Sequence, residues 1–263
     1  MKIVLITGGI GNQLFQYVFC RYLQSKGHRV YIKDETHAYL SHNGFELNKY
    51  FKIDLKPIPK WIYPFLKCYW HFFPKLYEMR KSRDKNLDES RLFFMGYWLN
   101  KRFWLPSTRI QFRQLPLNEK NSAVLQQILQ SESVSIHVRR GDYLKLGCFQ
   151  RFGGICTEAY YQQAVSVVEQ QVKQPKYFVF SDDIPWSREN LSIQDPVYVE
   201  WNQGDDSIYD MYLMSRCKYH IIANSTFGYW GAFISQDPLV VYPKKWFADK
   251  PAPDIFPDDW IGI

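Results

Sequence analysis

The segment 2-KIVLITGGIGNQLFQYVFCRYLQSKGHRVYIK-33 decides the fold of this chain. Residues 2–7 form an apolar run that closes at two glycines, as expected of a central parallel strand. Apolar residues then recur with a helical period from 12 to 26, and Gly27 is the expected stop of that helix. The run 29–33 predicts a second strand. The segment therefore predicts a βαβ unit of about thirty residues.

The rest of the chain continues this alternation without an internal repeat. Strands are predicted at 132–138, 177–181, 197–200, 219–224 and 239–243, and helices at 121–130, 157–173, 206–216 and 226–235. The order predicts an α/β fold of two Rossmann-like halves facing a central cleft, with an N-terminal half over 1–120 and a C-terminal half over 121–263. In such folds, ligands bind at the carboxyl ends of the strands.

Composition limits the classes of function. The 263 residues carry a formal net charge of +7, which favours a nucleotide, a nucleic acid or an acidic membrane surface as partner. The sequence has no RNP, zinc-finger or helix-turn-helix motif, so we do not expect nucleic-acid binding. Five cysteines without metal-ligand spacing predict reduced, mostly buried thiols of a cytosolic protein. We find neither a signal peptide nor an apolar run near the roughly 18 residues that cross a bilayer.

The first predicted strand ends in 8-GGIGNQLFQY-17. Glycines at such a turn let backbone amides approach a phosphate, and the following helix adds its positive end. The stretch is neither a GxGxxG dinucleotide fingerprint nor a P-loop. Gly9, Gly11, Asn12 and Gln13 are therefore candidate phosphate contacts, and the alternative is a tight turn in which Asn12 caps the helix.

The segment 137-HVRRGDY-143 follows another predicted strand. Two adjacent guanidinium groups there need an anionic partner, which is either a carboxylate of the chain or a ligand. Because side chains alternate along a strand, Arg139 shares a face with His137, and we assign Arg139 to a phosphate. Arg140 faces the other side and is the structural arginine. If the anionic partner is a carboxylate of the chain, Asp142 can accept from either guanidinium.

Acidic and hydroxyl residues follow two more predicted strands. Asp182 and Asp183 suit a helix cap or ribose hydroxyls, and we disfavour a metal because no histidine or third carboxylate is spaced nearby. At the start of the helix predicted over 226–235, Ser225 or Thr226 offers a hydroxyl and an amide to a phosphate. The alternative is that either residue is only an N-cap.

Together, these stretches resemble the α-1,2-fucosyltransferases of glycosyltransferase family 11. That family carries GGxGNQxFQY, HxRRGDY, FSDD and NSTFxWWxA blocks in this order, and all four occur here across nearly the whole chain. The one departure is Gly228-Tyr229-Trp230, where a second Trp is usual. The resemblance implies a GT-B-type architecture, a GDP-fucose donor, no metal and inversion at the anomeric carbon.

The resemblance also implies roles for individual residues. Arg139 is expected to bind the β-phosphate, and Asp210, fifteen residues before Ser225, is expected to read guanine together with His137. The implied donor-binding set is Gly9, Gly11, Asn12, Gln13, His137, Arg139, Asp182, Asp183, Asp210, Asn224, Ser225, Thr226 and Phe227. The implied catalytic pair is Arg139 and Asp142: a fixed guanidinium stabilises the charge that develops on the leaving diphosphate, and Asp142 is either the base or the brace of that arginine.

Three other kinds of protein remain as alternatives. A dinucleotide-dependent oxidoreductase fits the βαβ start, but Asp34 and Glu35 only half satisfy its requirement for an acid after the second strand. A different sugar-nucleotide transferase, or a basic nucleotide- or nucleic-acid-binding protein without activity, fits the charge. For a fucosyltransferase, the resemblance implies a galactose-terminated glycan acceptor, free or lipid-linked, as in O-antigen or capsule biosynthesis.

The stretch 56-KPIPKWIYPFLKCYWHFFPKLYEMR-80 combines eight aromatic residues with five lysines and arginines and a single acid. Four prolines prevent a long helix, although residues 65–73 suit one or two helical turns. One interpretation is that the rings pack between the two halves. The other is a surface that lies on anionic lipid, which would make this cytoplasmic protein peripheral at the inner face of a membrane.

Overall fold

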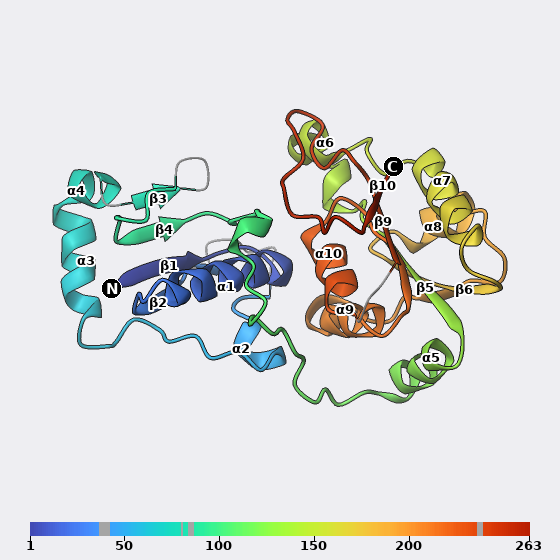
Figure 1. The fold of residues 1–263 in the computed structure, drawn as a ribbon, viewed down its shortest axis with the longest axis horizontal. Coiled ribbons are helices and arrows are strands. Elements are labelled where there is room, and N and C mark those ends of the chain that lie inside the picture. The colour runs from blue at the N-terminus through green and yellow to red at the C-terminus, as the bar shows by residue number, and fades with distance from the viewer. Residues whose placement is uncertain (37–42, 80, 84–86, 236–238) are drawn as a thin grey trace. The chain divides into compact units, whose positions relative to one another are not determined.

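In the computed structural model, the chain divides into two units, Met1–Arg113 (unit 1) and Gln114–Ile263 (unit 2). The structure describes all residues except 37–42, 80, 84–86 and 236–238 (Figure 1). Each unit is built on a parallel sheet, so the predicted α/β class is confirmed.

Unit 1 contains a sheet of order β2-β1-β4-β3 in which every pairing is parallel. Its strands are β1 (Lys2–Ile6), β2 (Val30–Asp34), β3 (Lys81–Arg83) and β4 (Phe93–Met95). The helical segments are α1 (Ile10–Ser25), α2 (Leu47–Tyr50), α3 (Tyr63–Phe72), α4 (Pro74–Met79) and the 3-10 turn η2 (Lys101–Phe103). The predicted β1-α1-β2 unit is confirmed. The central strand β4 was not predicted, because three residues are too few to show a period.

Alternate residues of the unit 1 strands serve two cores. Val4 and Phe94 pair in register, and Phe94 lies 5.5 Å, ring to ring, from Phe19 of α1. Ile3 and Phe93 point the other way, into a cluster that includes Leu66 of α3. Period-two alternation thus gives the sheet one face for α1 and one for α3.

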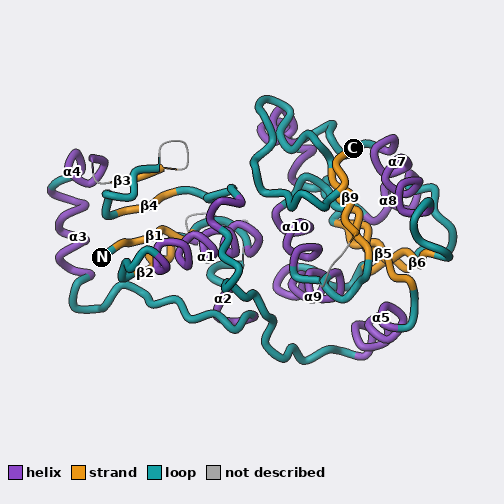
Figure 2. The backbone as a smooth tube through the Cα atoms, in the orientation of Figure 1, coloured by secondary structure: helices purple, strands orange, loops and turns teal. Residues whose placement is uncertain are grey.

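Unit 2 contains a second parallel sheet, of order β10-β9-β8-β5-β6-β7. Its strands are β5 (Glu132–Val138), β6 (Pro175–Ser181), β7 (Val197–Val199), β8 (Tyr219–Ile221), β9 (Leu239–Tyr242) and β10 (Ile261–Gly262). Its helices are α5 (Glu119–Leu129), α6 (Leu146–Phe152), α7 (Glu158–Glu169), α8 (Ile184–Asn190), α9 (Ser207–Met214) and α10 (Thr226–Phe233), with 3-10 turns η3 (Asp142–Leu144) and η4 (Gly204–Asp206). Figure 2 shows these helices in purple around the orange strands.

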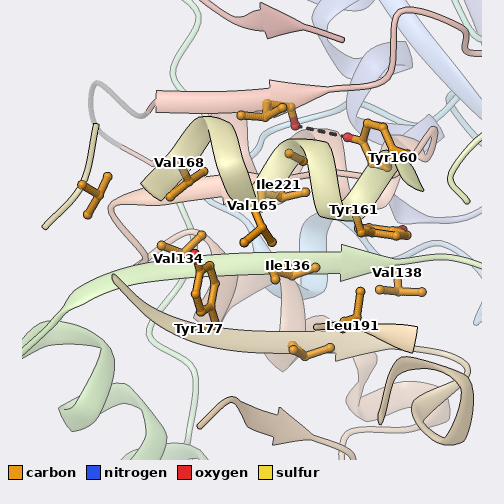
Figure 3. Close-up of a cluster of buried hydrophobic side chains, with 14 residues drawn as sticks. Val134, Ile136, Val138, Tyr160, Tyr161, Val165, Val168, Tyr177, Leu191 and Ile221 are labelled. Carbon is orange, nitrogen blue, oxygen red and sulfur yellow. Dashed lines mark hydrogen bonds between the residues drawn. The ribbon is translucent and has the colours of Figure 1, made fainter. Parts of the chain in front are cut away.

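The core of unit 2 lies where α7 packs on β5. Val134, Ile136 and Val138 are fully buried, and they face Val165 and Val168 of the helix (Figure 3). Residues 133–138 of β5 are all buried, as is typical of strands in parallel sheets that are covered on both faces. The side chain of Thr157 caps α7 by accepting from the Tyr160 amide, as predicted.

Two further sequence predictions have an outcome here. All five cysteines are free, as predicted, but only Cys20 and Cys217 are buried, so the expectation that most of them are buried is wrong. Among the described residues, no helix is long and apolar enough to span a bilayer.

Candidate active site

The candidate site lies at the carboxyl end of β5, an interior strand of the unit 2 sheet. The register pairs Val138, the last residue of β5, with Ser181, the last residue of β6. Arg139 and Asp182 are therefore the first residues beyond two neighbouring parallel strands. Parallel pairing brings the two groups to the same edge of the sheet, although 43 positions separate them.

Both arginines of this edge have carboxylate partners. Arg139 Nη2 lies 2.8 Å from Asp142 Oδ1, and its Nη1 lies 3.0 Å from Asp182 Oδ2. Arg140 Nε lies 3.1 Å from Asp183 Oδ2, and the Arg140 amide donates to Asp182 Oδ1. In this state, the anionic partners of the two adjacent guanidinium groups are thus internal.

Arg140 has the surroundings of a structural residue. Its guanidinium lies 4.1 Å from the centre of the Trp186 ring, and its partner Asp183 also caps α8 by accepting from the Trp186 amide. Arg139 is more open, with 34% of its side chain exposed against 23% for Arg140. Of the two, Arg139 is the guanidinium that a ligand can reach.

Gly141 makes this arrangement possible. A Cβ at Gly141 would lie 2.9 Å from Asp182 Oδ2, so any larger residue would push away the carboxylate that holds Arg139. Asp142 follows at the start of η3, and Tyr143 places its ring beneath the guanidinium of Arg139, 5.7 Å away. The segment 139–143 therefore holds the Arg139 guanidinium in one place, and we call this segment the Arg139 cradle.

His137 is buried and neutral behind this cradle. Burial first, and then the positive charge of Arg139, lowers the pKa of His137 to about 3. Its Nδ1 has no hydrogen-bond partner among the described residues, and its ring lies 5.8 Å from that of Phe227. A Cβ at Gly228 would lie 2.5 Å from Nδ1, so this glycine allows α10 to approach the histidine.

The start of α10 lies at the same edge. Ser225 is the N-cap, and its hydroxyl accepts from the Phe227 amide, while Thr226 is the first helical residue. Asn224 is buried, and its side-chain amide donates to the carbonyls of Trp246 and Phe152. Tyr143 donates its hydroxyl to the Asn224 carbonyl at 3.0 Å, which ties the arginine cradle to the start of α10.

Asp210 lies on α9 in a separate polar network. Its Oδ1 accepts from Asn202 at 2.8 Å, and Asn202 exchanges hydrogen bonds with Asn121. Burial raises the pKa of Asp210 to about 8, which the hydrogen bond from Asn202 only partly offsets. No hydrogen bond or ion pair between described residues joins Asp210 to the Arg139 cradle.

The glycine-rich turn belongs to unit 1. Gly9 is the N-cap of α1, and Asn12 lies inside the first turn, so the alternative in which Asn12 caps the helix is wrong. Gln13 is buried, and its amide donates to the carbonyls of Gly8 and Gly44. Gly11 lies on the same turn, so the four predicted residues cluster at the end of β1 within unit 1.

Sequence reasoning missed several residues that position the site. Trp186, Gly228 and Asn202 act through spatial contacts with residues 46, 91 and 8 positions away (Arg140, His137 and Asp210), for which the sequence carries no local signal. The sequence pointed to Tyr143 only as a member of the HVRRGDY segment, without a role of its own. Within the described residues, no group of three or more His, Cys, Asp or Glu side chains is arranged to hold a metal ion.

Comparisons with known proteins agree with these features. The sequence profile described as Glycosyl transferase family 11 matches residues 117–263. The chain is 32% identical to an "Alpha-1,2-colitosyltransferase" of Escherichia coli over all of this chain and 99% of that protein. It is 38% identical to the "O-antigen biosynthesis glycosyltransferase WbnK" of Escherichia coli over 51% of this chain and 45% of that protein. It is also 30% identical to the "Galactoside alpha-(1,2)-fucosyltransferase 1" of Bos taurus over 51% of this chain and 39% of that protein.

A solved structure of NodZ alpha-1,6-fucosyltransferase, soaked with GDP-fucose, aligns with 89% of this chain and 92% of its own at 14% identity and a TM-score of 0.46. The profile match covers more than half of the chain, and the first relative is similar along its whole length. The resemblance drawn from the four sequence blocks is therefore confirmed: the chain belongs to glycosyl transferase family 11.

Proposed function

We propose that this chain is an inverting, metal-independent galactoside α-1,2-fucosyltransferase, which moves L-fucose from GDP-fucose to the 2-hydroxyl of a terminal galactose. One observation carries the proposal: the half-exposed guanidinium of Arg139 stands at the carboxyl edge of a parallel sheet, between two carboxylates and beside His137. Family membership supports the reaction class, and the names of several relatives support the sugar and the linkage.

The β-phosphate of the donor binds Arg139 in this proposal. A guanidinium has five N–H donors in a rigid fork, so it can exchange Asp142 for two phosphate oxygens and keep Asp182 as its anchor. Ser225 and Thr226 add their hydroxyl groups at the start of α10, where the helix dipole favours an anion.

Asp210 and His137 read the guanine in this proposal. Guanine presents N–H donors on one edge, so the buried Asp210 must lose its proton to accept from them, which costs little at a pKa of about 8. Neutral His137 offers the nucleotide its Nδ1, which has no hydrogen-bond partner among the described residues. Asp182 and Asp183 lie at the nucleoside, Phe227 offers a half-buried ring, and Asn224 shapes the helix start from beneath.

The transfer step needs no group beyond these. The galactose 2-hydroxyl attacks the anomeric carbon of fucose as the bond from that carbon to the β-phosphate oxygen breaks. The electron pair of the broken bond stays on the phosphate, where Arg139 stabilises it more in the transition state than in the ground state. The proton of the hydroxyl passes to Asp142, which the arriving phosphate has released from Arg139.

The turn at the end of β1 offers further candidate phosphate contacts in this proposal. Gly9 and Gly11 keep the backbone open at the end of β1, while Asn12 and Gln13 extend along the first turn of α1. The rest of unit 1 is then the acceptor side. The acceptor is a galactose-terminated glycan, free or lipid-linked, and the five free thiols suit a cytoplasmic enzyme of O-antigen or capsule biosynthesis.

The donor sugar has one specific alternative. The Escherichia coli relative that aligns over the whole chain is named for colitose, which is fucose without its 3-hydroxyl. A colitose donor presents the same kind of diphosphate leaving group, so the Arg139 cradle suits both sugars. The sugar pocket alone distinguishes them, since a site built to bond a hydroxyl rejects the analogue that lacks it.

The proposal is tested by incubating the EDTA-treated protein with GDP-fucose and a panel of galactosides. We expect a product with a new α-1,2 linkage, visible by NMR, and no gain from added Mg²⁺ or Mn²⁺. In parallel, GDP should raise the melting temperature, whereas NAD and oligonucleotides should not. Transfer activity that depends fully on an added metal rules out the metal-independent mechanism. A melting temperature that rises with NAD but not with GDP rules out a GDP-sugar as the donor. Faster transfer from GDP-colitose than from GDP-fucose reassigns the donor.

A further inference from the structure

Helix α3 of unit 1 has two apolar faces, and only one of them is used by the fold. Ile62, Leu66 and Tyr69 recur at helical spacing and pack into the cluster around Ile3 and Phe93. These contacts anchor the helix to the sheet through a single stripe. A second stripe, roughly 100° around the same helix, therefore needs its own explanation.

That second stripe is aromatic and exposed. Trp61, Phe65 and Phe72 are 73%, 73% and 68% exposed. Phe65, Cys68 and Phe72 recur at the 3-4 spacing of one helix face, and Trp61 lies in the turn just before α3. Tyr63, Phe73 and Met79 extend the exposed apolar surface along 61–79. The other exposed large apolar residues of the described chain are scattered singly over both units. A contiguous apolar patch of this kind marks an interaction surface, whereas single exposed residues are ordinary.

Two lysines lie on this helix or directly before it. Lys67 is on α3, and Lys60 lies in the turn just before it. At about 100° per residue, Lys67 lies roughly 140–160° around the helix from Phe65 and Phe72, so the rings and the lysine flank opposite sides of the helix surface that faces away from the sheet. No ion pair with a described residue engages either ammonium group. The surface therefore joins apolar rings to unneutralised positive charge.

We propose that this aromatic–basic surface, Trp61, Phe65, Phe72, Lys60 and Lys67, docks unit 1 on an anionic lipid bilayer. Aromatic rings are favoured in the headgroup layer, and each lysine near an anionic membrane adds attraction to lipid phosphates. The ten residues of α3 span only about 15 Å, half of a hydrocarbon core, so the helix lies on the membrane rather than across it.

A second copy of the chain fits this surface less well. A two-fold interface brings the same patch of both copies together, so the lysines of one copy would face the lysines of the other. With a net charge of +7 on each chain, that contact lacks charge complementarity. An anionic bilayer supplies both the apolar layer and the opposite charge.

Vesicle co-sedimentation tests the proposal with the full chain. We expect binding to phosphatidylcholine vesicles that contain phosphatidylglycerol, little binding to pure phosphatidylcholine, and loss of binding at high salt. Phe65→Ser/Phe72→Ser and Lys60→Glu/Lys67→Glu should each weaken binding at least about tenfold. These side chains are exposed, so far-UV circular dichroism should show the fold unchanged.

Matched controls separate this surface from general stickiness and charge. Leu129→Ser/Phe149→Ser removes two exposed apolar side chains from unit 2, and Lys52→Glu/Lys173→Glu makes the same charge change away from α3. Both controls should bind within about twofold of wild type, because they leave the surface intact.

Three results would overturn the proposal. The first is equal and negligible binding to both kinds of vesicle at low salt. The second is binding that survives in the Phe65→Ser/Phe72→Ser chain. The third is a dimer in sedimentation velocity that this variant loses while vesicle binding is absent, which would assign the surface to a second copy. Vesicle binding is measured without any enzyme assay, so its outcome neither supports nor contradicts the proposed function. That function is tested separately by the transfer assay.

Discussion

Two groups of cations in this chain have opposite surroundings. At the end of β5, Arg139 and Arg140 stand between three carboxylates that the fold brings to them. At α3, Lys67 and, in the turn before the helix, Lys60 have no ion-pair partner among the described residues, and the same helix exposes aromatic rings. The first arrangement fixes a guanidinium in place before any ligand arrives. The second leaves charge and apolar area for a partner outside the chain.

The difference lies in what each region must do. A transition-state contact has to be held rigidly, since catalysis depends on groups that do not reorganise. A docking surface tolerates mobile side chains, because its partner is fluid and attraction adds over many weak contacts. The residue types follow the same division. The site uses the rigid, forked guanidinium of arginine, and the exposed surface uses the flexible side chain of lysine.

The largest expected effect is that of Asp142→Asn. If Asp142 is the base, kcat falls by about two to four orders of magnitude, while GDP affinity stays within about threefold because Asp182 still holds Arg139. Steady-state kinetics and a calorimetric GDP titration on the same variant provide the measurement. A parallel fall in GDP affinity or melting temperature would show that Asp142 only braces the arginine.

Arg139→Lys should follow in size. Lysine keeps the charge but loses the fork, so we expect kcat/KM to fall roughly a hundredfold, about 3 kcal/mol. Arg140→Lys is the matched control, since it breaks the contact with Trp186 and should lower the melting temperature more than it lowers kcat/KM. Near wild-type kinetics in Arg139→Lys would remove the distinction between the two arginines.

Asp210 gives a smaller effect that depends on pH. If guanine binds only the carboxylate form, a pKa of about 8 predicts that GDP affinity rises about eightfold from pH 7 to pH 8.5. Asp210→Asn should bind GDP weakly and lack this rise, while the ionisation of the phosphates is common to both proteins. An unchanged pH profile in the variant would exclude Asp210 from the base contact.

The same pKa shift affects stability with a definite sign. The folded pKa is raised above the unfolded value, so the protonated form stabilises the fold most below about pH 4, and this contribution is lost as pH rises to about 8. The melting temperature of wild type should therefore fall over this window more than that of Asp210→Asn. A steeper fall in the variant would contradict a buried, protonated Asp210.

The smallest effect is expected on α3. Phe65→Ser/Phe72→Ser should change the melting temperature by less than about 2 °C, because surface changes cost within about 0.5 kcal/mol. Leu66→Ala, on the inner face of the same helix, should cost about 2 kcal/mol or more. Equal destabilisation by both variants, in a thermal melt, would mean that the outer rings are part of the core.

Much of this could be predicted from the sequence, because strong local patterns specify it. The strands β1 and β5 and the cap at Thr157 are confirmed, and so is the expectation that Asp142 can pair with an arginine. The contacts of Asp182 and Asp183 with the arginines depend on β5 and β6 being neighbours, which a single strand pattern does not specify. The outward direction of Phe65 and Phe72 depends on which stripe of α3 meets the sheet, and both stripes are apolar.

The central claim is that Arg139 exchanges its carboxylate partner for the β-phosphate, and comparing GDP with GMP tests it most directly. Calorimetric titrations of wild type should show much tighter binding of GDP than of GMP, since only GDP carries the β-phosphate. In Arg139→Lys, this preference should largely disappear while GMP affinity stays near wild type. A preference for GDP that persists undiminished in Arg139→Lys would contradict the account.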